Sequence, residues 1–162
     1  YRLPTEAERE KAARGGFSAR RFPWGDTISW NNANYLASPA ALGGSYSYDV
    51  APAFGFDPAY NDGSQGPYTS PVGDLPANGY GLYDMAGNVL VWCWDGYAGP
   101  PYPSGSPYLG GANPHGPTTS STRVVRGGSW FSYARVERCA TRANFDPDYY
   151  QNAVGFRCVR GL

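Results

Sequence analysis

The sequence contains few of the residues on which most catalytic and metal sites depend. Among its 162 residues, His115 is the only histidine and Lys11 the only lysine, and there are three cysteines. Thirteen basic residues balance thirteen acidic ones, so the composition does not favour nucleic acid or an anionic membrane surface as a partner. No apolar run approaches the roughly 20 residues that cross a bilayer, and we therefore expect no membrane span.

The three cysteines, Cys93, Cys139 and Cys158, form no familiar pattern. They cannot all pair within one chain, and their spacing is typical neither of a zinc module nor of a disulfide-dense secreted scaffold. A disulfide between two of them stays open. The favoured interpretation is that the thiols are buried and pack as small hydrophobic groups.

Glycine, proline and tyrosine are abundant, at 22, 15 and 14 residues. Nearly every cation is arginine, whose planar fork suits fixed pairing with carboxylates and carbonyls. We therefore expect long ordered loops held in place by aromatic rings and arginines, with less regular secondary structure than average. The length predicts a single domain over residues 1–162.

Few regular elements are expected. The stretch PTEAEREKAARGG predicts an N-terminal helix, with Thr5 as N-cap and Glu8 completing a capping box. Residues 89–94 predict a central strand covered on both faces, Val124 begins a second strand, and residues 156–159 predict a closing strand.

The remaining aromatic residues suggest how loops are anchored. FPWGD, residues 22–26, predicts a turn whose two rings fill the core, and Trp92, Trp94 and Trp130 are also expected in the core. Residues 27–71 form a long polar region, in which Asn and Asp oxygens either hold calcium or simply make turns. From the residues alone, turns are favoured.

Residues 123–160 stand out as a candidate binding segment. Gly127 and Gly128 precede Trp130 at its start, and Gly155-Phe156-Arg157 close it. The middle mixes aromatic, small and polar residues without a usable period, and it contains neither histidine nor lysine. This pattern is typical of a rigid frame that presents a surface, and suits binding better than catalysis.

Ordered motifs connect the chain to a known family. RLPTEAE with AARGG, FPWGD, NGYGLYDMAGNV, RVVRGGSW and GFRCVR resemble the formylglycine-generating-enzyme (sulfatase-modifying-factor) domain family over essentially the whole chain. The resemblance implies an α+β, C-type-lectin-like domain that is rich in loops and has few short strands. It also implies strands ahead of RLPTEAE that this sequence does not contain.

The family's oxidase chemistry does not carry over by resemblance. Those enzymes oxidise a sulfatase cysteine with two copper-holding cysteines after the GGS-aromatic motif; the first position falls on Ser132, and neither Tyr133 nor Ala134 supplies the second thiol. A hydroxyl cannot replace a soft thiolate on Cu(I), so we expect no copper and no catalytic residue. The family's iron-dependent sulfoxide synthases need a histidine cluster, which one histidine cannot form. Cys139 and Cys158 match structural family cysteines whose disulfide partner positions are vacant.

The resemblance also implies structural calcium. The ligands of one family site map to Asn34, Tyr35 (backbone), Asp62 and Ser64 (backbone). Those of a second site map to Asp84, Gly87 and Val89, where Val91 stands in place of an expected glutamate.

A narrower resemblance points to diversity-generating-retroelement variable proteins built on this domain. In those proteins a GSW…GFR frame encloses positions that are mutagenised at template adenines. Here the candidate variable positions are Phe131, Ser132, Tyr133, Arg135, Val136, Thr141, Ala143, Asn144, Phe145, Asp146, Tyr149, Tyr150 and Ala153. The intervening frame positions include Ala134, Arg138, Cys139, Arg142, Pro147 and Asp148.

The favoured function is therefore a non-catalytic recognition domain whose 131–153 surface binds a protein or other macromolecule. The aromatic positions would act as anchors, with Arg135 and Asp146 supplying polar specificity. The alternatives are a formylglycine-generating oxidase or related oxidoreductase, and an ordinary loop that covers the core. Clustered exposure of the aromatic positions would speak against an ordinary loop.

Overall fold

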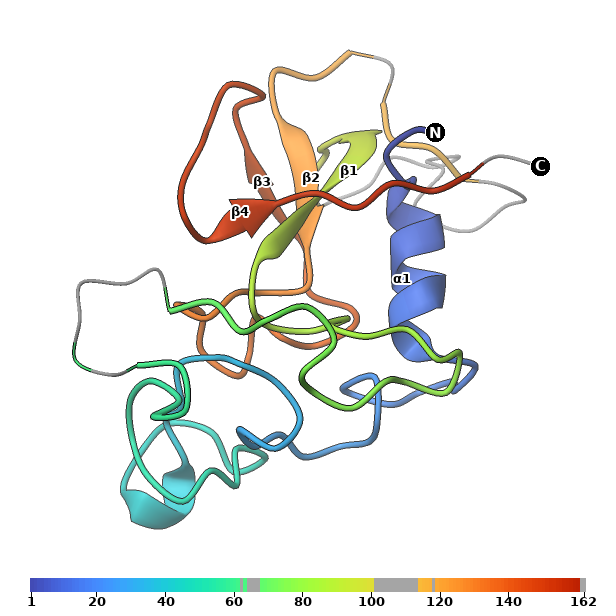
Figure 1. Cartoon of the computed structure of the whole chain (residues 1–162). Coiled ribbons are helices and arrows are strands. Elements are labelled where there is room, and N and C mark those ends of the chain that lie inside the picture. The colour runs from blue at the N-terminus through green and yellow to red at the C-terminus, as the bar shows by residue number, and fades with distance from the viewer. Residues whose placement is uncertain (62, 64–67, 101–113, 118, 161–162) are drawn as a thin grey trace.

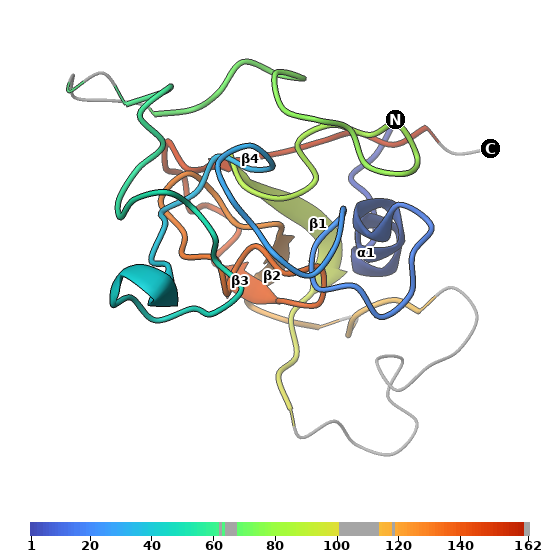
Figure 2. The ribbon, with the colours of Figure 1, turned by 90° about the horizontal axis from the view of Figure 1, so that it is seen from below.

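The computed structural model describes residues 1–61, 63, 68–100, 114–117 and 119–160. One helix, α1 (Glu6–Arg14), stands beside a small sheet, and long loops make up the rest (Figures 1 and 2). A short 3-10 helix, η1 (Ala40–Leu42), interrupts one of these loops. No helix within the described ranges is long and apolar enough to cross a membrane. The loop-rich α+β fold predicted from the sequence is confirmed.

Helix α1 begins and ends as the sequence predicts. Thr5 accepts a hydrogen bond from the Glu8 amide, and the Glu8 side chain accepts one from the Thr5 amide in return, which completes the capping box. Gly15 ends the helix in the left-handed conformation, with φ 58°. Arg9 and Ala13 lie on the buried face of the helix, which places a cation inside the protein.

The sheet has the strand order β3-β2-β1-β4. Its members are β1 (Leu90–Gly96), β2 (Arg123–Arg126), β3 (Ala143–Phe145) and β4 (Val154–Gly155). β1 pairs antiparallel with β2 and parallel with β4, and β2 pairs antiparallel with β3. β1 is therefore internal, as predicted, and three of the four strands come from the candidate binding segment.

The prediction that β1 is covered on both faces is wrong. Val91 and Cys93 are buried, but Trp94 on the opposite face is 57% exposed and Trp92 is only half buried. The alternation of a strand fixes which residues share a face, but not whether another element covers that face. Trp130, by contrast, is buried as predicted.

Two smaller predictions also need correction. The closing strand is Val154–Gly155 and not residues 156–159, because the Val159 backbone pairs instead with Arg2 in an isolated bridge. Cys93 and Cys139 are buried free thiols, as favoured, whereas Cys158 is free but exposed.

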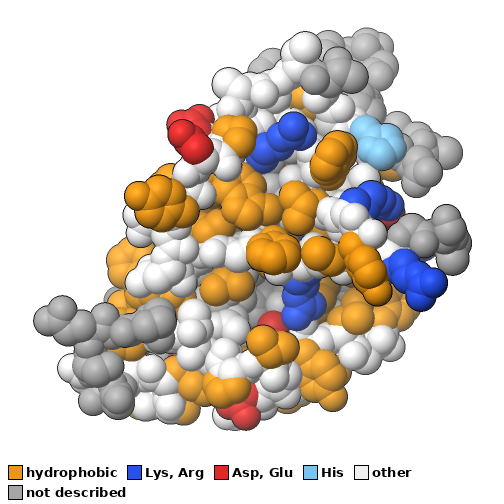
Figure 3. Space-filling view, turned by 45° about the horizontal axis from the view of Figure 1, so that its top comes forward, with side chains coloured by type: hydrophobic (Ala, Val, Ile, Leu, Met, Phe, Trp, Pro, Cys, Tyr) orange, Lys and Arg blue, Asp and Glu red, His pale blue; other side chains and the backbone are white. Residues whose placement is uncertain are grey.

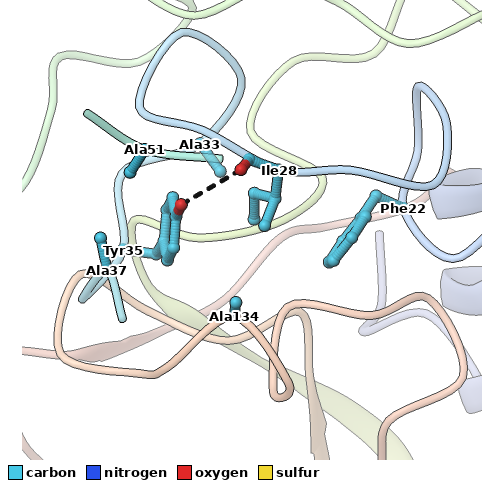
Figure 4. Packing of buried hydrophobic residues seen from close by; sticks show 7 residues of the cluster. All are labelled: Phe22, Ile28, Ala33, Tyr35, Ala37, Ala51 and Ala134. Carbon is cyan, nitrogen blue, oxygen red and sulfur yellow. Dashed lines mark hydrogen bonds between the residues drawn. The ribbon is translucent and has the colours of Figure 1, made fainter. Parts of the chain in front are cut away.

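The larger of the two apolar clusters is built from loop residues (Figure 4). It comprises Phe22, Ile28, Ala33, Tyr35, Ala37, Ala51 and Ala134. Phe22 is fully buried with Trp24 packed against it, which confirms the predicted role of the FPWGD turn. The Tyr35 hydroxyl donates to Asp49 at 2.5 Å, so this buried polar group is satisfied. Ala134 brings the C-terminal segment into the same cluster.

Candidate recognition surface

The candidate binding segment is anchored at its start by a buried carboxylate. Glu137 is 1% exposed, and its Oε1 accepts a hydrogen bond from the Ser129 amide at 3.1 Å. Gly128 has φ 68°, and a Cβ atom there would overlap the Glu137 carboxylate. Removal from water raises the pKa of Glu137 well above its ordinary range, although Arg9 and backbone amides oppose this. The second glycine of the GGSW motif is thus required by a side chain nine residues further on, whereas a Cβ at Gly127 would meet Arg9.

The predicted frame positions after Trp130 differ in burial: Ala134 and Cys139 are buried, whereas Arg138, Pro147 and Asp148 are exposed. Ala134, Glu137 and Cys139 are buried, and the Cys139 amide donates to the Arg21 carbonyl at 2.9 Å. None of the candidate variable positions is buried. The exposed ones are Phe131, Tyr133, Arg135, Asp146, Tyr149 and Tyr150. The half-buried ones are Ser132, Val136, Thr141, Ala143, Asn144, Phe145 and Ala153.

One group of rings surrounds Phe131. Its ring stacks on Phe56 with centroids 6.0 Å apart, and Phe56 in turn stacks on Tyr68. Tyr133 lies near Tyr46, with centroids 6.1 Å apart. Phe56 and Tyr46 could not be assigned to this surface from the sequence, because both come from the long loop region that lacks a period.

A second group of rings lies at β3. Tyr149 stacks on Phe145 with centroids 4.2 Å apart, and Trp92 meets Phe145 edge-on at 6.3 Å. Tyr150, the next residue, is 89% exposed. Many hydrophobic side chains are exposed on the face shown in Figure 3, with several Lys or Arg side chains among them.

Trp130 belongs to the group around Phe131 and is also bonded to the backbone just before β4. Its ring packs edge-on against Phe131 at 5.4 Å, while its Nε1 donates to the Asn152 carbonyl at 3.4 Å. Arg135, Val136 and Thr141 belong to a separate turn, in which the Thr141 hydroxyl donates to the Arg135 carbonyl at 2.8 Å. The candidate positions therefore comprise two groups of rings and a separate polar turn.

Arginines brace the segment against the helix. Arg142 donates through Nε and Nη2 to the two oxygens of Glu6, at 2.6 and 2.7 Å. Arg126 pairs with Glu6 at 3.3 Å and with Glu10. These two arginines hold the backbone in place, which agrees with their expected bracing role.

The family's two copper-holding cysteines would map to Ser132 and to Tyr133 or Ala134, and none of these three residues carries a thiol. Ser132 Oγ lies 3.0 Å from Ser129 Oγ, the Tyr133 ring is exposed, and the Ala134 methyl is buried in the loop cluster. Burial raises the pKa of Cys93 to about 12 and also raises that of Cys139, so both are protonated near neutral pH. This local chemistry does not suit Cu(I) bound by a thiolate pair.

The first predicted calcium site is only half described, because Asp62 and Ser64 lie outside the described residues. In the described half, the Tyr35 carbonyl already accepts a hydrogen bond from Trp30 Nε1 at 3.2 Å. Asn34 is buried, and its Nδ2 donates to the Tyr68 carbonyl at 2.7 Å, so Oδ1 is the side-chain atom that remains as a calcium ligand.

The second predicted calcium site offers one suitable atom. Asp84 Oδ1 is buried without a hydrogen-bond partner, while Oδ2 accepts from the Gly73 amide at 2.9 Å. Arg157 Nη2 lies 3.9 Å from the same carboxylate and competes with any cation there. Gly87 and Val89 would contribute backbone oxygens only. Across the described ranges, no group of three or more His, Cys, Asp or Glu side chains forms a metal cluster, and His115 is exposed.

Comparisons with known proteins match this chain over almost all of its length. A family model described as "Sulfatase-modifying factor enzyme 1-like domain" matches residues 1–162. The formylglycine-generating enzyme of Streptomyces coelicolor is 40% identical, over 98% of this chain and 46% of its own length.

Two solved structures are also similar. Treponema denticola variable protein 1 has a TM-score of 0.65 and 32% identity over 96% of this chain and 45% of its own. PvdO from Pseudomonas aeruginosa has a TM-score of 0.62 and 29% identity over 96% of this chain and 50% of its own. The chain thus spans about half the length of these relatives.

Proposed function

Because the chain belongs to the sulfatase-modifying factor enzyme 1-like domain family, we propose that it is a member that recognises a ligand and does not oxidise cysteine. The ligand binds the candidate variable positions between Phe131 and Ala153. One observation carries the proposal: every candidate position reaches the surface, while Ala134, Glu137 and Cys139 between them are buried.

The chemistry of the surface suits a protein partner. Stacked rings such as Phe145 and Tyr149 offer large contact areas at little conformational cost, since they are already held by their neighbours. Ser132, Asn144 and Asp146 add hydrogen-bonding groups at the same surface. Aromatic anchors within a polar surround are typical of protein-binding surfaces, and the similarity to a variable protein supports this assignment.

The gene can test the proposal directly. We expect a near-copy of the coding sequence for residues 123–160 beside a reverse transcriptase gene, differing only at template adenines. The differences should fall on codons of the candidate variable positions and spare those of Ala134, Glu137 and Cys139. A genome without such a copy, or a copy that differs at the buried codons, would overturn diversification of this surface.

The oxidase alternative has its own assay. The purified protein, loaded with Cu(I) in the presence of oxygen, should form no aldehyde from a peptide containing the sulfatase cysteine motif. Hydroxylamine capture followed by mass spectrometry measures the aldehyde, with the Streptomyces coelicolor enzyme as positive control. Aldehyde above the copper-only background would favour the oxidase and contradict the proposed function.

A further inference from the structure

A groove of about 800 Å³ lies outside the candidate recognition surface. It is formed by three loop segments, which contribute Ser29, Trp30, Asn31, Val50, Pro52, Asp57, Pro58, Ala59, Tyr60, Asp74, Leu75 and Pro76. Its volume is in the range of small-ligand sites. None of the candidate variable positions and none of the calcium ligands implied by the family resemblance belongs to this lining.

The groove contains negative charge that no described cation neutralises. Asp57 is 5% exposed, and its Oδ1 accepts a hydrogen bond from the Ala59 amide at 2.9 Å. Its Oδ2 accepts none from the described residues, and burial raises the pKa of this carboxyl. Asp74 accepts from the Tyr60 hydroxyl at 2.7 Å. Among the described residues, neither aspartate forms an ion pair, and no Lys, Arg or His lines the groove.

The other walls of the groove are apolar and held in place. Trp30 is fixed by the hydrogen bond from its Nε1 to the Tyr35 carbonyl. Tyr60 is fixed by its bond to Asp74, and three prolines and Val50 add apolar surface. Asp57 Oδ2 accepts no hydrogen bond from the described residues, so a cationic group placed there would neutralise a carboxylate that is largely removed from water. The faces of Trp30 and Tyr60 would attract the same cation. Both features select the same chemical group.

We propose that this groove binds an organic cation, namely a primary ammonium or guanidinium group carried on an apolar stem. The cationic group lies against Asp57 Oδ2 and Asp74, and the stem packs between Trp30 and Tyr60. A free alkylamine and the side chain of a lysine or arginine in a peptide share this chemistry. The groove is separate from the candidate variable positions, so this site goes beyond the proposed function and does not depend on it.

The test titrates each probe into the full chain and monitors binding by ¹H–¹⁵N NMR. The reporters are the Trp30 indole N–H, assigned with a Trp30→Phe variant, and the Ala59 amide. The cationic probes are n-pentylammonium chloride and N-acetyl-lysine N-methylamide; the neutral probes of matched length are 1-pentanol and N-acetyl-norleucine N-methylamide. We expect saturable shifts at both reporters with the cationic probes only.

The variants keep the hydrogen bonds and remove the charge. Asp57→Asn still accepts from the Ala59 amide, and should weaken binding by about tenfold or more because a charge-assisted contact is lost. Asp74→Asn still accepts from Tyr60, and should weaken binding less because Asp74 is exposed. Asp148→Asn removes the same charge at an exposed position outside the groove and should leave affinity unchanged.

The outcomes separate clearly. Tighter binding of pentylammonium would identify a free amine, and tighter binding of the lysine amide a peptide side chain; either supports the site. Equal shifts with neutral probes, no saturable shift with either cation, or unchanged affinity in Asp57→Asn would overturn it. If the spectrum of Asp57→Asn shows misfolding, unchanged affinity in Asp74→Asn overturns the proposal instead.

Discussion

Gly128 occupies a position where a side chain would overlap the carboxylate of Glu137. The glycine also adopts φ 68°, a left-handed conformation that other residues enter at a cost. The two residues therefore depend on each other: the carboxylate reaches the Ser129 amide only because position 128 has no Cβ. This pair therefore stabilises the start of the candidate binding segment.

Gly128→Ala should destabilise the protein by about 3 kcal/mol or more, since it combines a strained φ with overlap against a buried group. Urea unfolding followed by circular dichroism measures the change. Gly25→Ala is the matched control, because a Cβ at Gly25 meets nothing within 4 Å, and it should cost less than about 1 kcal/mol. Equal losses in the two variants would contradict the role assigned to Gly128.

Glu137 should make stability fall as the pH rises. Its folded pKa is raised by burial, so the neutral acid is favoured in the fold. Its stabilising contribution is complete below the ordinary glutamate pKa of about 4.3, and is lost as the pH rises from there toward the folded value. Glu137→Gln still accepts from Ser129 and cannot ionise.

Unfolding free energies of the wild type and Glu137→Gln between pH 5 and pH 8 test this prediction. The wild type should lose stability across that range relative to the variant. Glu8→Gln provides a contrast, because Arg2 lowers the pKa of Glu8 to about 2 and the stabilisation by Glu8 is lost only as the pH falls below the ordinary value. A wild-type profile parallel to that of Glu137→Gln would contradict the pKa shift of Glu137.

The exposed and buried positions of the candidate binding segment should respond differently to substitution. Tyr150→Ala should change the free energy of unfolding by less than about 0.5 kcal/mol, because the ring is 89% exposed. Ala134→Leu should cost about 1–3 kcal/mol, because it adds volume inside the loop cluster. Thermal unfolding compares the two. A large loss in Tyr150→Ala would mean that this ring supports the fold and is not a free contact group.

We further propose structural calcium at the site mapped to Asn34, Tyr35, Asp62 and Ser64. The melting temperature should then be higher in calcium than in EDTA, because a ligand that binds only the folded state stabilises it. Asp62→Ala should abolish the difference, whereas Asp84→Asn should leave it intact if the first site dominates. An identical melting temperature in calcium and EDTA would rule out both sites.

The sequence motifs were sufficient to predict the family and the loop-rich α+β fold, both of which are confirmed. The capping box at Thr5 and Glu8 could be predicted because it depends on residues three positions apart. The exposure of Trp94 could not, because a strand pattern does not specify which elements will cover it. The ring contacts of Tyr46 and Phe56 were missed for a similar reason, since an aperiodic loop gives no sign of its distant partners.

The groove at Asp57 and Asp74 was also beyond sequence reasoning. Aspartates in a region rich in Gly, Pro and Tyr are interpreted first as turn formers, and Asp57 does bond its own loop. Its burial beside Trp30 depends on how three separate loops meet. The diversity-generating pattern predicted which positions of the 131–153 surface are variable; the structure finds none of them buried.

The alternation of buried and outward-facing residues after Trp130 has a consequence for evolution. A few inward side chains, among them Ala134, Glu137 and Cys139, specify the path of the backbone. Under the proposed function, the outward-facing positions between them vary while this path is kept. Substitutions at the outward-facing positions would then change the binding surface at little cost in stability. The range of ligands would be limited by the side chains available there and less by unfolding.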